Sequence, residues 1–432
     1  MTVNVIGLSK ILTNVCGFLI LLSVSALAQS DQAATTIKPN ITPNANTEIY
    51  KLVFLTGGLD DKSYSKLGKK KEAQQRRNDQ AEFITKLNEA GSQGYRAILT
   101  QGLFAIVKLD NTPYEYAGFE TDEGGRSIQR GLKNRYLSFA QQAYALRDYT
   151  LMSHQCETKY LNSPGEMQEW RQDSCSWIYW FLWERVKGDT RPAELILASN
   201  NPTSNKATVQ AETAAADLTM QVKEALAKGY QVTHSFSKFE LLLQKTNQSD
   251  FSPQDSEIQV INDGVSEDKI EALKTKINSL AQQGYRLASL GYDIAVMYRP
   301  KGTTLPVSYV WLNVIPKNAE SELAQLQSKG AVYRMIHPGE NGERALMVFE
   351  QPMNSNASQR EYKLLKMELE GIEKKAEKKV VIELTPETKD VMKTVNQLAQ
   401  EGFIVRDQLA GGNKTEGKRR ISVTNILMER TR

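Results

Sequence analysis

The chain has 432 residues, of which 24% are charged, and its formal net charge at pH 7 is +4. A balance so close to neutral gives no general argument for nucleic acid as a partner, because nucleic-acid binding needs a clustered basic face. The three histidines and three cysteines are scattered, so the sequence indicates neither a metal site nor a cofactor. Beyond the N-terminal region no run is long and apolar enough to span a bilayer, and we expect a chain that is not membrane-spanning.

The first 28 residues have the pattern of a secretory signal peptide. One basic residue, Lys10, precedes an apolar run from Ile11 to Leu27, and the run ends in the small residues around Ala28. This pattern predicts cleavage after Ala28 and export to the periplasm or out of the cell. Residues 29–46 are polar, contain two prolines and show no periodicity, which is typical of a flexible leader.

From residue 47 onward, one pattern recurs six times: a strand, a helix with a single apolar stripe, and two further strands. The predicted helices stop at Gly94, Asp148, Gly229, Gly284, Gly330 and Gly402. Counting back eleven, seven and four positions from each stop gives apolar residues on one helical face, with Gln141 as the only exception. A glycine after a helix accepts the left-handed conformation, and an aromatic residue that follows it packs back on the last turn. The fifth copy has Ala331 at that position, with Tyr333 as its candidate substitute.

The two runs after each helix are short and rich in β-branched and aromatic residues, which predicts a hairpin. The fold class is therefore α+β, with about six tandem βαββ repeats that each have a small antiparallel sheet and one helix on one face. Because a unit this small buries little apolar surface, we expect neighbouring repeats to pair into pseudo-symmetric domains. The predicted boundaries of repeats 1 to 6 are 47–112, 113–188, 189–250, 251–303, 304–356 and 357–432.

Several of the last strands of the repeats end in an apolar or aromatic residue followed by charged residues, as in Trp183-Glu184-Arg185 and Met428-Glu429-Arg430. Charge at the outer end of a strand usually protects an open sheet edge from unwanted pairing. We therefore expect these side chains to be solvated.

The mature chain contains two cysteines, Cys156 and Cys175, in the second repeat. In an oxidising compartment such a pair favours one disulfide. We expect the bridge to close the base of a long loop over residues 157–174, just after one hairpin strand and just before the next. A zinc pair is the alternative, but no histidines cluster nearby.

The most unusual local feature is an aromatic strand in the same repeat. Alternation along the strand places Trp177, Tyr179, Phe181 and Trp183 on one face, and Trp170 lies nearby in the sequence. One interpretation is a strand that is buried on both faces. The other is an exposed aromatic platform that binds sugar rings or a hydrophobic partner.

The search for catalytic residues finds no convergent set. The three histidines, His154, His234 and His337, lie in different copies, and no serine or cysteine has the sequence context of a nucleophile. We therefore predict no catalytic residue, and any enzyme activity stays open but less favoured.

The repeats resemble a family of small bacterial domains of unknown function. The residues that carry the resemblance are the strand Tyr50-Lys51-Leu52-Val53, the helix end from Leu87 to Tyr95, and Tyr362-Lys363-Leu364-Leu365. Members of that family open with a Tyr-Lys-Val type of strand and continue through a helix ending Leu-x-x-x-Gly-Trp/Tyr into two strands. Here tyrosine or phenylalanine replaces the common tryptophan. The resemblance implies the βαββ fold and a bacterial source, and it implies no catalytic residue.

Three functions follow as hypotheses. The first is a noncatalytic exported binding or scaffold module of the cell envelope, with a protein or polysaccharide partner. The second is a small-ligand binding or sensing protein for a sugar or lipid, with its aromatic site in repeat 2. The third is a hydrolase of unrecognised type.

Overall fold

The structure is a computed structural model that describes residues 48–55, 57–59, 68–100, 104–121, 135, 137–161, 170–199, 207–237, 240–245, 256–262, 269–291, 294–300, 305–313, 319–337, 346–353, 360–374, 379–383, 385–416 and 419–431. The predicted signal peptide and leader lie outside these residues, so the predicted cleavage after Ala28 stays a prediction. Residues 42–432 belong to one compact unit. Among the described residues, none of the helices has the length and apolar character needed to cross a membrane.

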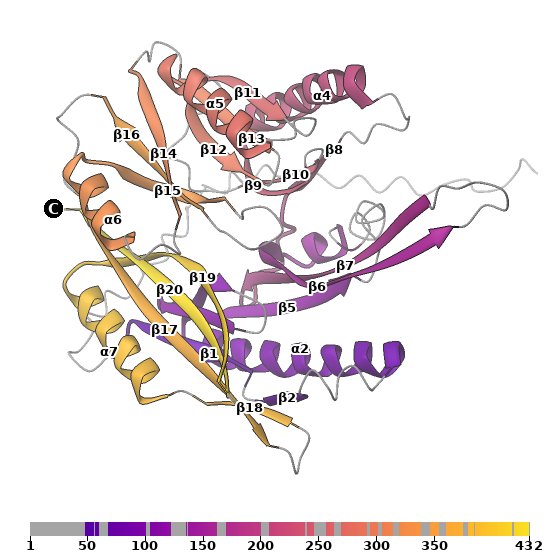
Figure 1. Cartoon of the computed structure of the whole chain (residues 1–432), viewed down its shortest axis with the longest axis vertical. Coiled ribbons are helices and arrows are strands. Elements are labelled where there is room, and N and C mark those ends of the chain that lie inside the picture. The colour runs from indigo at the N-terminus through magenta and orange to yellow at the C-terminus, as the bar shows by residue number, and fades with distance from the viewer. Residues whose placement is uncertain are drawn as a thin grey trace, which may run out of the picture. The chain divides into compact units, whose positions relative to one another are not determined.

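The order strand, helix, strand, strand occurs six times along the described residues, so the predicted α+β class with tandem βαββ repeats is confirmed (Figure 1). The first three repeats consist of β1 (Tyr50–Phe54), α2 (Gly68–Ser92), β3 (Tyr95–Thr100) and β4 (Phe104–Leu109); β5 (Tyr114–Thr121), a helical segment at residues 137–141, β6 (Ala145–Leu161) and β7 (Trp170–Val186); and β8 (Leu195–Ser199), α4 (Ala207–Ala227), β9 (Tyr230–Ser237) and β10 (Glu240–Lys245).

The last three repeats consist of β11 (Ser256–Asn262), α5 (Lys269–Gln282), β12 (Arg286–Leu290) and β13 (Ile294–Pro300); β14 (Val307–Asn313), α6 (Ala319–Ser328), β15 (Val332–His337) and β16 (Leu346–Pro352); and β17 (Arg360–Lys374), β18 (Lys379–Glu383), α7 (Pro386–Gln400), β19 (Ile404–Glu416) and β20 (Arg419–Thr431). In every sheet the last strand lies between the first and the second and pairs antiparallel with both. Among the described strands, only the sixth sheet is larger, because β18 pairs with β17, and β2 (Gly57–Leu59) pairs with β18.

The helix stops are confirmed in five repeats and wrong in the second. Gly94, Gly229, Gly284, Gly330 and Gly402 all have a positive φ, between 67° and 92°. In the second repeat the positive φ of 69° belongs to Ala143, whereas Asp148 lies five residues later inside β6. With Ala143 as the stop, Phe139 takes the position four residues before it, and the exception at Gln141 disappears. The error arose because Tyr144 and Tyr149 both follow plausible stop residues, and sequence spacing does not choose between them.

Each sheet has a β-bulge at the same place. The second and last strands change register around the fourth residue after the stop in every repeat, at Ile98, Arg147, Thr233, Ala288, Arg334 and Arg406. A bulge leaves one residue unpaired and bends its strand, which re-aims the neighbouring side chains.

The helix of each repeat packs between its own sheet and the sheet of the next repeat. In the first joint, Phe83 and Leu87 of α2 share one apolar core with Tyr116 and Trp180 of the second sheet. The same arrangement recurs for α4, α5 and α6 and for the helical segment of the second repeat. The contacts therefore continue from repeat to repeat and do not stop after pairs, as separate two-repeat domains would require.

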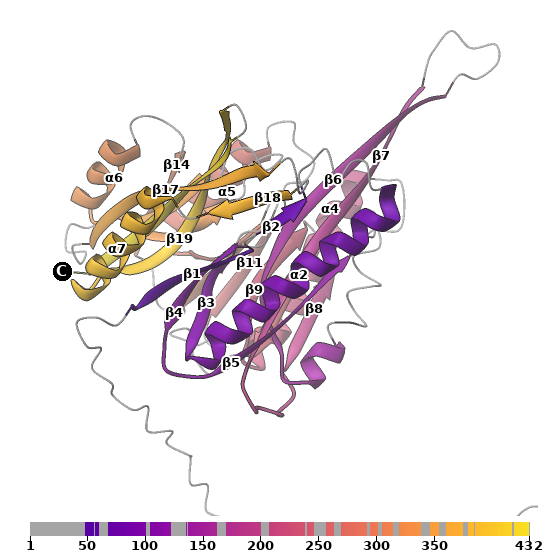
Figure 2. The ribbon, with the colours of Figure 1, turned by 90° about the horizontal axis from the view of Figure 1, so that it is seen from below.

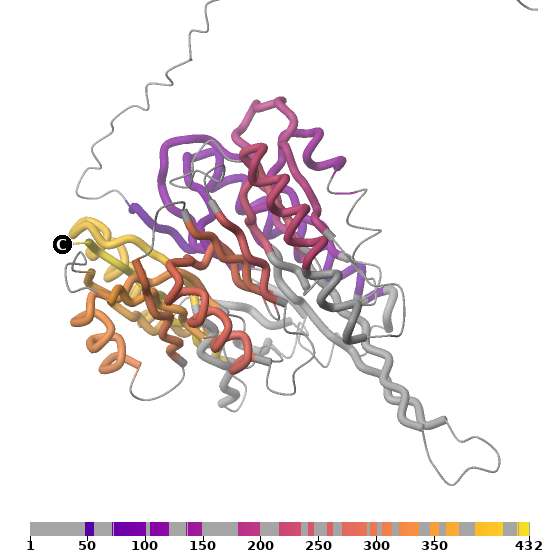
Figure 3. Tube along the Cα trace, turned by 90° about the horizontal axis from the view of Figure 1, so that it is seen from above, coloured from indigo at the N-terminus to yellow at the C-terminus, as the bar shows by residue number. Residues whose placement is uncertain are grey.

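The last joint returns to the first repeat. Val395 of α7 and Phe403 pack against Tyr50 and Ile106 of the first sheet. Asn396 of α7 accepts a hydrogen bond from the Tyr50 backbone N–H at 2.8 Å and donates to the Tyr50 carbonyl at 2.9 Å. Figures 2 and 3 show the yellow sixth repeat beside the indigo β1. Six repeats in sequence thus make a closed cycle of contacts.

Polar contacts of one kind recur at these joints. An asparagine of the helix brackets the backbone of a first-strand tyrosine at three joints, formed by Asn88 with Tyr116, Asn278 with Tyr309, and Asn396 with Tyr50. The same tyrosine hydroxyls, and that of Tyr362, accept the backbone N–H just before the bulge of the preceding sheet, from Ala97, Leu287, Val405 and Tyr333 respectively. These bonds satisfy buried donors that the bulge removes from the ladder.

The second repeat differs from the others in the length of its hairpin. β6 and β7 have 17 residues each, whereas β5 pairs only with residues 179–186 of β7 (Figure 2). The expected loop over residues 157–174 is therefore wrong in part, because β6 continues to Leu161 and β7 begins at Trp170. Cys156 and Cys175 are direct partners in the register of this hairpin.

Candidate functional site

Three repeats place a cation over the aromatic ring that follows the helix stop. The guanidinium groups of Arg185, Arg299 and Arg430 lie 4.6, 4.8 and 4.4 Å from the ring centroids of Tyr144, Tyr285 and Phe403, respectively. An acid of the first strand pairs with each guanidinium: Glu115 at 2.6 Å, Glu257 at 2.5 Å and Glu361 at 2.6 Å. We call this arrangement the ring–cation–acid group.

The other two repeats with an aromatic residue after the stop keep variants of the group. In the third repeat Lys245 pairs with Glu194 at 3.1 Å, and the Tyr230 hydroxyl donates to Glu194 at 3.2 Å. In the first repeat the cation comes from the first strand, because Lys51 Nζ lies 4.3 Å from the Tyr95 ring centroid. Five repeats therefore close the end of the helix with an aromatic ring and a cation near it.

The fifth repeat lacks all three members of the group. Ala331 stands in place of the ring, Gln351 in place of the cation and Ser308 in place of the acid. The equivalence follows from the strand register: Ser308 pairs with Gln351 across β14 and β16, as Glu257 pairs with Arg299 and Glu361 with Arg430. Ala331 is fully buried and belongs to the apolar core of the repeat.

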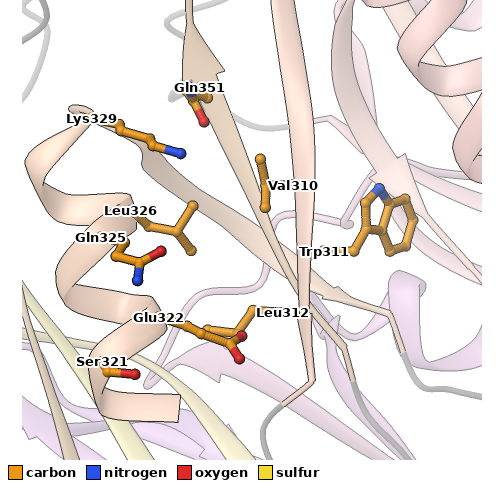
Figure 4. Close-up of a pocket in the computed structure, with 9 residues that line it drawn as sticks. All are labelled: Val310, Trp311, Leu312, Ser321, Glu322, Gln325, Leu326, Lys329 and Gln351. Atoms are coloured by element: carbon orange, nitrogen blue, oxygen red, sulfur yellow. The ribbon is translucent and has the colours of Figure 1, made fainter. Parts of the chain in front are cut away.

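A hollow of about 480 Å³ lies between α6 and β14 in this repeat (Figure 4). Its apolar lining includes Val310, Leu312 and Leu326, and Leu312 and Leu326 belong to the core of the repeat. Its polar lining consists of Ser321, Glu322, Gln325, Lys329 and Gln351. Figure 4 shows Lys329 and Gln351 at one end of the hollow and Ser321 and Glu322 at the other.

Two residues of the hollow, Val310 and Gln351, take positions that lie close to the ring in other repeats. In the first repeat, Tyr95 lies under Lys51, and its hydroxyl donates to the Glu48 carbonyl at 2.8 Å, so its ring crosses from the second strand toward the start of the first. The residue equivalent to Lys51 is Val310, because Tyr50 and Tyr309 take the same position at their joints. Val310 lines the hollow.

The predicted substitute for the ring, Tyr333, does not fill this space. Its hydroxyl donates to Asp407 of the sixth repeat, and its backbone N–H donates to the Tyr362 hydroxyl at 2.8 Å. The side chain is therefore part of the joint between the fifth and sixth repeats. The substitution was expected from proximity in sequence, whereas the bulge at Arg334 directs Tyr333 toward the next sheet.

The expectation that strand-end charges are solvated is wrong for three acids, because the joints cover this end of the strands. Glu184, Glu350 and Glu429 are only 6%, 7% and 1% exposed. Their arginine partners are Arg96 for Glu184 at 2.5 Å, Arg286 and Arg334 for Glu350 at 3.3 and 3.0 Å, and Arg360 and Arg406 for Glu429. The sequence analysis did not predict these ion pairs. A glutamate recurs just before the arginine or glutamine near the end of the last strand, and this recurrence could have indicated a shared structural role.

A second polar cluster joins Asp407 to other repeats. Its carboxylate accepts a hydrogen bond from the Tyr333 hydroxyl, and the Thr100 hydroxyl of the first repeat donates to Asp148 of the second. Burial raises the pKa of Asp407 to about 6, and the nearby negative charge of Asp148 adds to the rise. Burial lowers the pKa of His234 to about 4. Perturbed carboxyls occur at functional sites and in structural networks alike, and the described contacts of Asp407 and Asp148 join side chains of different repeats.

The predicted aromatic platform divides into two parts. Phe181 and Trp183 are buried in the core between the second and third repeats, where Trp183 stacks on Phe139 with centroids 5.0 Å apart. The side chains of Trp170, Trp177 and Tyr179 lie outside the described residues, so their role in binding stays a prediction. Trp180 faces the other side, where it packs on Phe83 of α2. The described half of the strand is therefore buried on both faces.

Among the described residues, no three histidine, cysteine, aspartate or glutamate side chains are placed to hold a metal ion. The side chains of His154 and His337 lie outside the described part. The chain matches no family model, and neither a curated protein nor a solved structure is detectably similar to it. The resemblance to small bacterial βαββ domains thus rests on the sequence motif, while the repeat architecture is seen directly.

Proposed function

We propose that the chain is a noncatalytic, exported binding or scaffold protein of the cell envelope and that the hollow of the fifth repeat receives its ligand or partner. The observation that supports this proposal most strongly is the joint loss of ring, cation and acid in one repeat of six. Loss of one member would leave a charge or a ring without its partner. The hollow of this repeat combines aliphatic walls with several polar side chains, and a concave site with convergent polar groups is a usual place for binding.

The charges of the hollow favour binding over catalysis. Glu322 lies on α6 and Lys329 follows its last residue directly, and a separation of seven residues corresponds to about 10 Å along a helix axis. An acid and a base that act on one reacting bond must both lie within hydrogen-bond reach of it, at about 3 Å. These two side chains therefore suit contacts to opposite ends of a bound group.

The size of the hollow also favours the small-ligand alternative over a purely structural scaffold. Its volume of about 480 Å³ falls within the range of roughly 300–1,000 Å³ that is usual for sites of small molecules. The site proposed from the sequence for that alternative was the aromatic strand of repeat 2. The fifth repeat is now the better candidate, because it has a hollow, whereas Phe181 and Trp183 of the aromatic strand are buried.

Site-specific crosslinking in the producing cells tests the proposal. A photoreactive lysine analogue is placed at position 329, inside the hollow, and in a matched variant at position 324, which is on the exposed face of α6. We expect position 329 to give an adduct of defined mass in the exported fraction and position 324 to lack it. The same adduct pattern at both positions, or none at either, would contradict a binding role for the hollow.

A further inference from the structure

We infer that the hollow of the fifth repeat binds a short zwitterionic peptide, whose ammonium group lies at Glu322 and whose carboxylate lies at Lys329. This inference rests on the proposed binding function and names the chemistry of the ligand. It follows from the charges at the two ends of the hollow, which differ from those at the same positions of the other repeats (Figure 4).

The first step of the argument concerns Glu322, the acidic residue at one end of the hollow. It lies eight residues before the helix stop of its repeat, and it is the only acid among the six residues at that position. The other five repeats have Lys86, Arg135, Gln221, Lys276 and Thr394 there. Three repeats thus have a cation where the fifth repeat has a carboxylate.

Two of these cations donate to the backbone of their own first strand. Lys86 Nζ donates to the Phe54 carbonyl at 3.3 Å, and the Arg135 guanidinium donates to the Glu120 carbonyl at 3.3 Å. Both carbonyls lie four residues after the first-strand tyrosine, so the equivalent carbonyl in the fifth repeat belongs to Asn313. The carboxylate of the fifth repeat cannot donate to this carbonyl, because an ionised carboxylate only accepts hydrogen bonds. An ammonium group of a ligand can take the place of the missing cation and pair with the carboxylate as well.

The second step concerns Lys329 and Gln351 at the other end of the hollow. In three other repeats an arginine takes the position of Gln351 and pairs with an acid of the first strand. The fifth repeat has neither partner, because Gln351 is opposite Ser308 in the strand register. Lys329 is exposed, and the one acid among the described lining residues, Glu322, lies at the other end. A ligand carboxylate can therefore accept a charge-assisted hydrogen bond from the Lys329 ammonium and another from the Gln351 amide.

The third step concerns the length of the ligand. The separation of Glu322 and Lys329 by seven residues corresponds to about 10 Å along a helix axis. A single amino acid carries its ammonium and carboxylate on one carbon atom and cannot reach both ends, whereas an extended dipeptide spans up to about 7 Å. Contacts of about 3 Å at the charged groups supply the rest. Between the two ends, Val310, Leu312 and Leu326 offer aliphatic contact to a side chain such as that of leucine.

Isothermal titration calorimetry of the full-length mature protein with the dipeptide Ala-Leu tests the inference. Three comparison compounds each lack one feature: N-acetyl-Ala-Leu has no ammonium group, Ala-Leu-amide has no carboxylate, and free leucine has both charges on one carbon. We expect saturable binding of Ala-Leu and about three- to ten-fold weaker binding of each comparison compound.

Two substitutions assign the ends of the ligand. Glu322→Gln should weaken Ala-Leu about three- to ten-fold but leave N-acetyl-Ala-Leu unchanged, because that compound has no ammonium group to lose. Lys329→Gln should weaken Ala-Leu by a similar factor but leave Ala-Leu-amide unchanged. The matched controls are Glu320→Gln, in the first turn of α6 but outside the hollow, and Lys228→Gln, at the position of Lys329 in the third repeat. Both controls should bind Ala-Leu as the wild type does.

Three results would overturn the inference. They are no saturable binding of Ala-Leu by the wild type, equal binding of Ala-Leu and free leucine, and an equal loss of Ala-Leu and N-acetyl-Ala-Leu binding in Glu322→Gln. Each of them leaves the crosslinking test of the binding function untouched, because that test does not depend on a zwitterionic ligand.

Discussion

At the scale of single residues, small side chains decide how closely a helix approaches the next sheet. Three positions before the stop, the first, second, fourth and sixth repeats have Gly91, Ala140, Ala281 and Ala399. Ala140 accepts a backbone hydrogen bond from Ala193 of the third repeat at 2.8 Å, so backbones meet directly at this point. Gly91 makes the closest approach: a Cβ atom there would lie 2.5 Å from the Tyr114 carbonyl oxygen of β5.

We expect Gly91→Ala to destabilise the chain although alanine is the better helix former by about 1 kcal/mol. The obstacle is backbone and cannot rotate away, so α2 must move off β5 and loosen the core around Phe83. The expected loss is on the order of 1–3 kcal/mol, measured from the midpoint of urea unfolding. Ser92→Ala, one residue further on the exposed side, is the control and should shift the midpoint little. A midpoint that rises with Gly91→Ala would contradict the close approach of α2 and β5.

At the scale of elements, the β6–β7 hairpin is the outlier. Residues 170–178 of β7, which precede the part paired with β5, pair with β6 alone among the described strands, and an isolated two-stranded ribbon is at best marginally stable in water. Cys156 and Cys175 face each other in the register of this ribbon. Opposite residues of an antiparallel pair have Cα atoms roughly 4.5–5.5 Å apart, a separation that a disulfide can span.

We therefore predict a disulfide between Cys156 and Cys175 in the exported protein. Alkylation under denaturing conditions without reductant should label no thiol in the mature chain, and reduction should release two. The disulfide should stabilise the ribbon by about 3 kcal/mol, because it closes the loop of residues between the two cysteines. Reduction should therefore make amide exchange in β6 and β7 faster. Two free thiols in protein taken directly from the exported compartment would refute the bridge.

At the scale of the whole molecule, the closed cycle of contacts makes the two ends of the described chain depend on each other. Tyr50, which is 1% exposed, donates its backbone N–H to Asn396, 346 residues away, and its carbonyl accepts a hydrogen bond from the same side chain. Removing such a bond leaves a buried polar group unsatisfied, which costs about 1–3 kcal/mol. Asn278 makes the equivalent bonds to Tyr309 at an internal joint and provides a matched comparison.

Asn396→Ala and Asn278→Ala should lower stability by similar amounts but loosen different places. The first variant should speed amide exchange in β1 and α7, and the second in β14 and α5. Hydrogen exchange followed by mass spectrometry separates the two patterns. If β1 exchanges equally fast in the wild type and in Asn396→Ala, the first and sixth repeats are not joined as described.

Asp407 gives the molecule a pH dependence that spans several repeats. Because its pKa is raised to about 6, the folded chain holds this proton more tightly than the unfolded chain, whose aspartate has a pKa of about 3.9. Stability from this group is therefore fully present below about pH 4 and is lost as the pH rises through about 6. His234 has the opposite effect on the pH dependence, because its pKa in the folded chain is lowered to about 4. The folding stability that neutral His234 contributes is lost as the pH falls from about 6.5 toward 4.

Comparison with Asp407→Asn isolates the aspartate, since His234 is common to both proteins. The amide still accepts the hydrogen bond from Tyr333. We expect the variant to gain on the order of 1–3 kcal/mol relative to the wild type between pH 4 and pH 7. Urea unfolding at several pH values measures the difference, and a difference that is constant with pH would show that the pKa of Asp407 is not raised.

The sequence by itself determined the repeating unit. Apolar periodicity, a flexible stop residue and two β-rich runs are local signals, and they specified the strand, helix, strand, strand order and the α+β class. They failed where local alternatives were equal, at Asp148 and Ala143, and in the length of the β6–β7 hairpin. The tertiary structure decided what depends on parts of the chain that meet in space: the burial of Glu184, Glu350 and Glu429, the closure of α7 on β1, and the hollow between α6 and β14. The physical reason is that these features arise from residues far apart in sequence, so their packing and electrostatics leave no pattern within any one repeat.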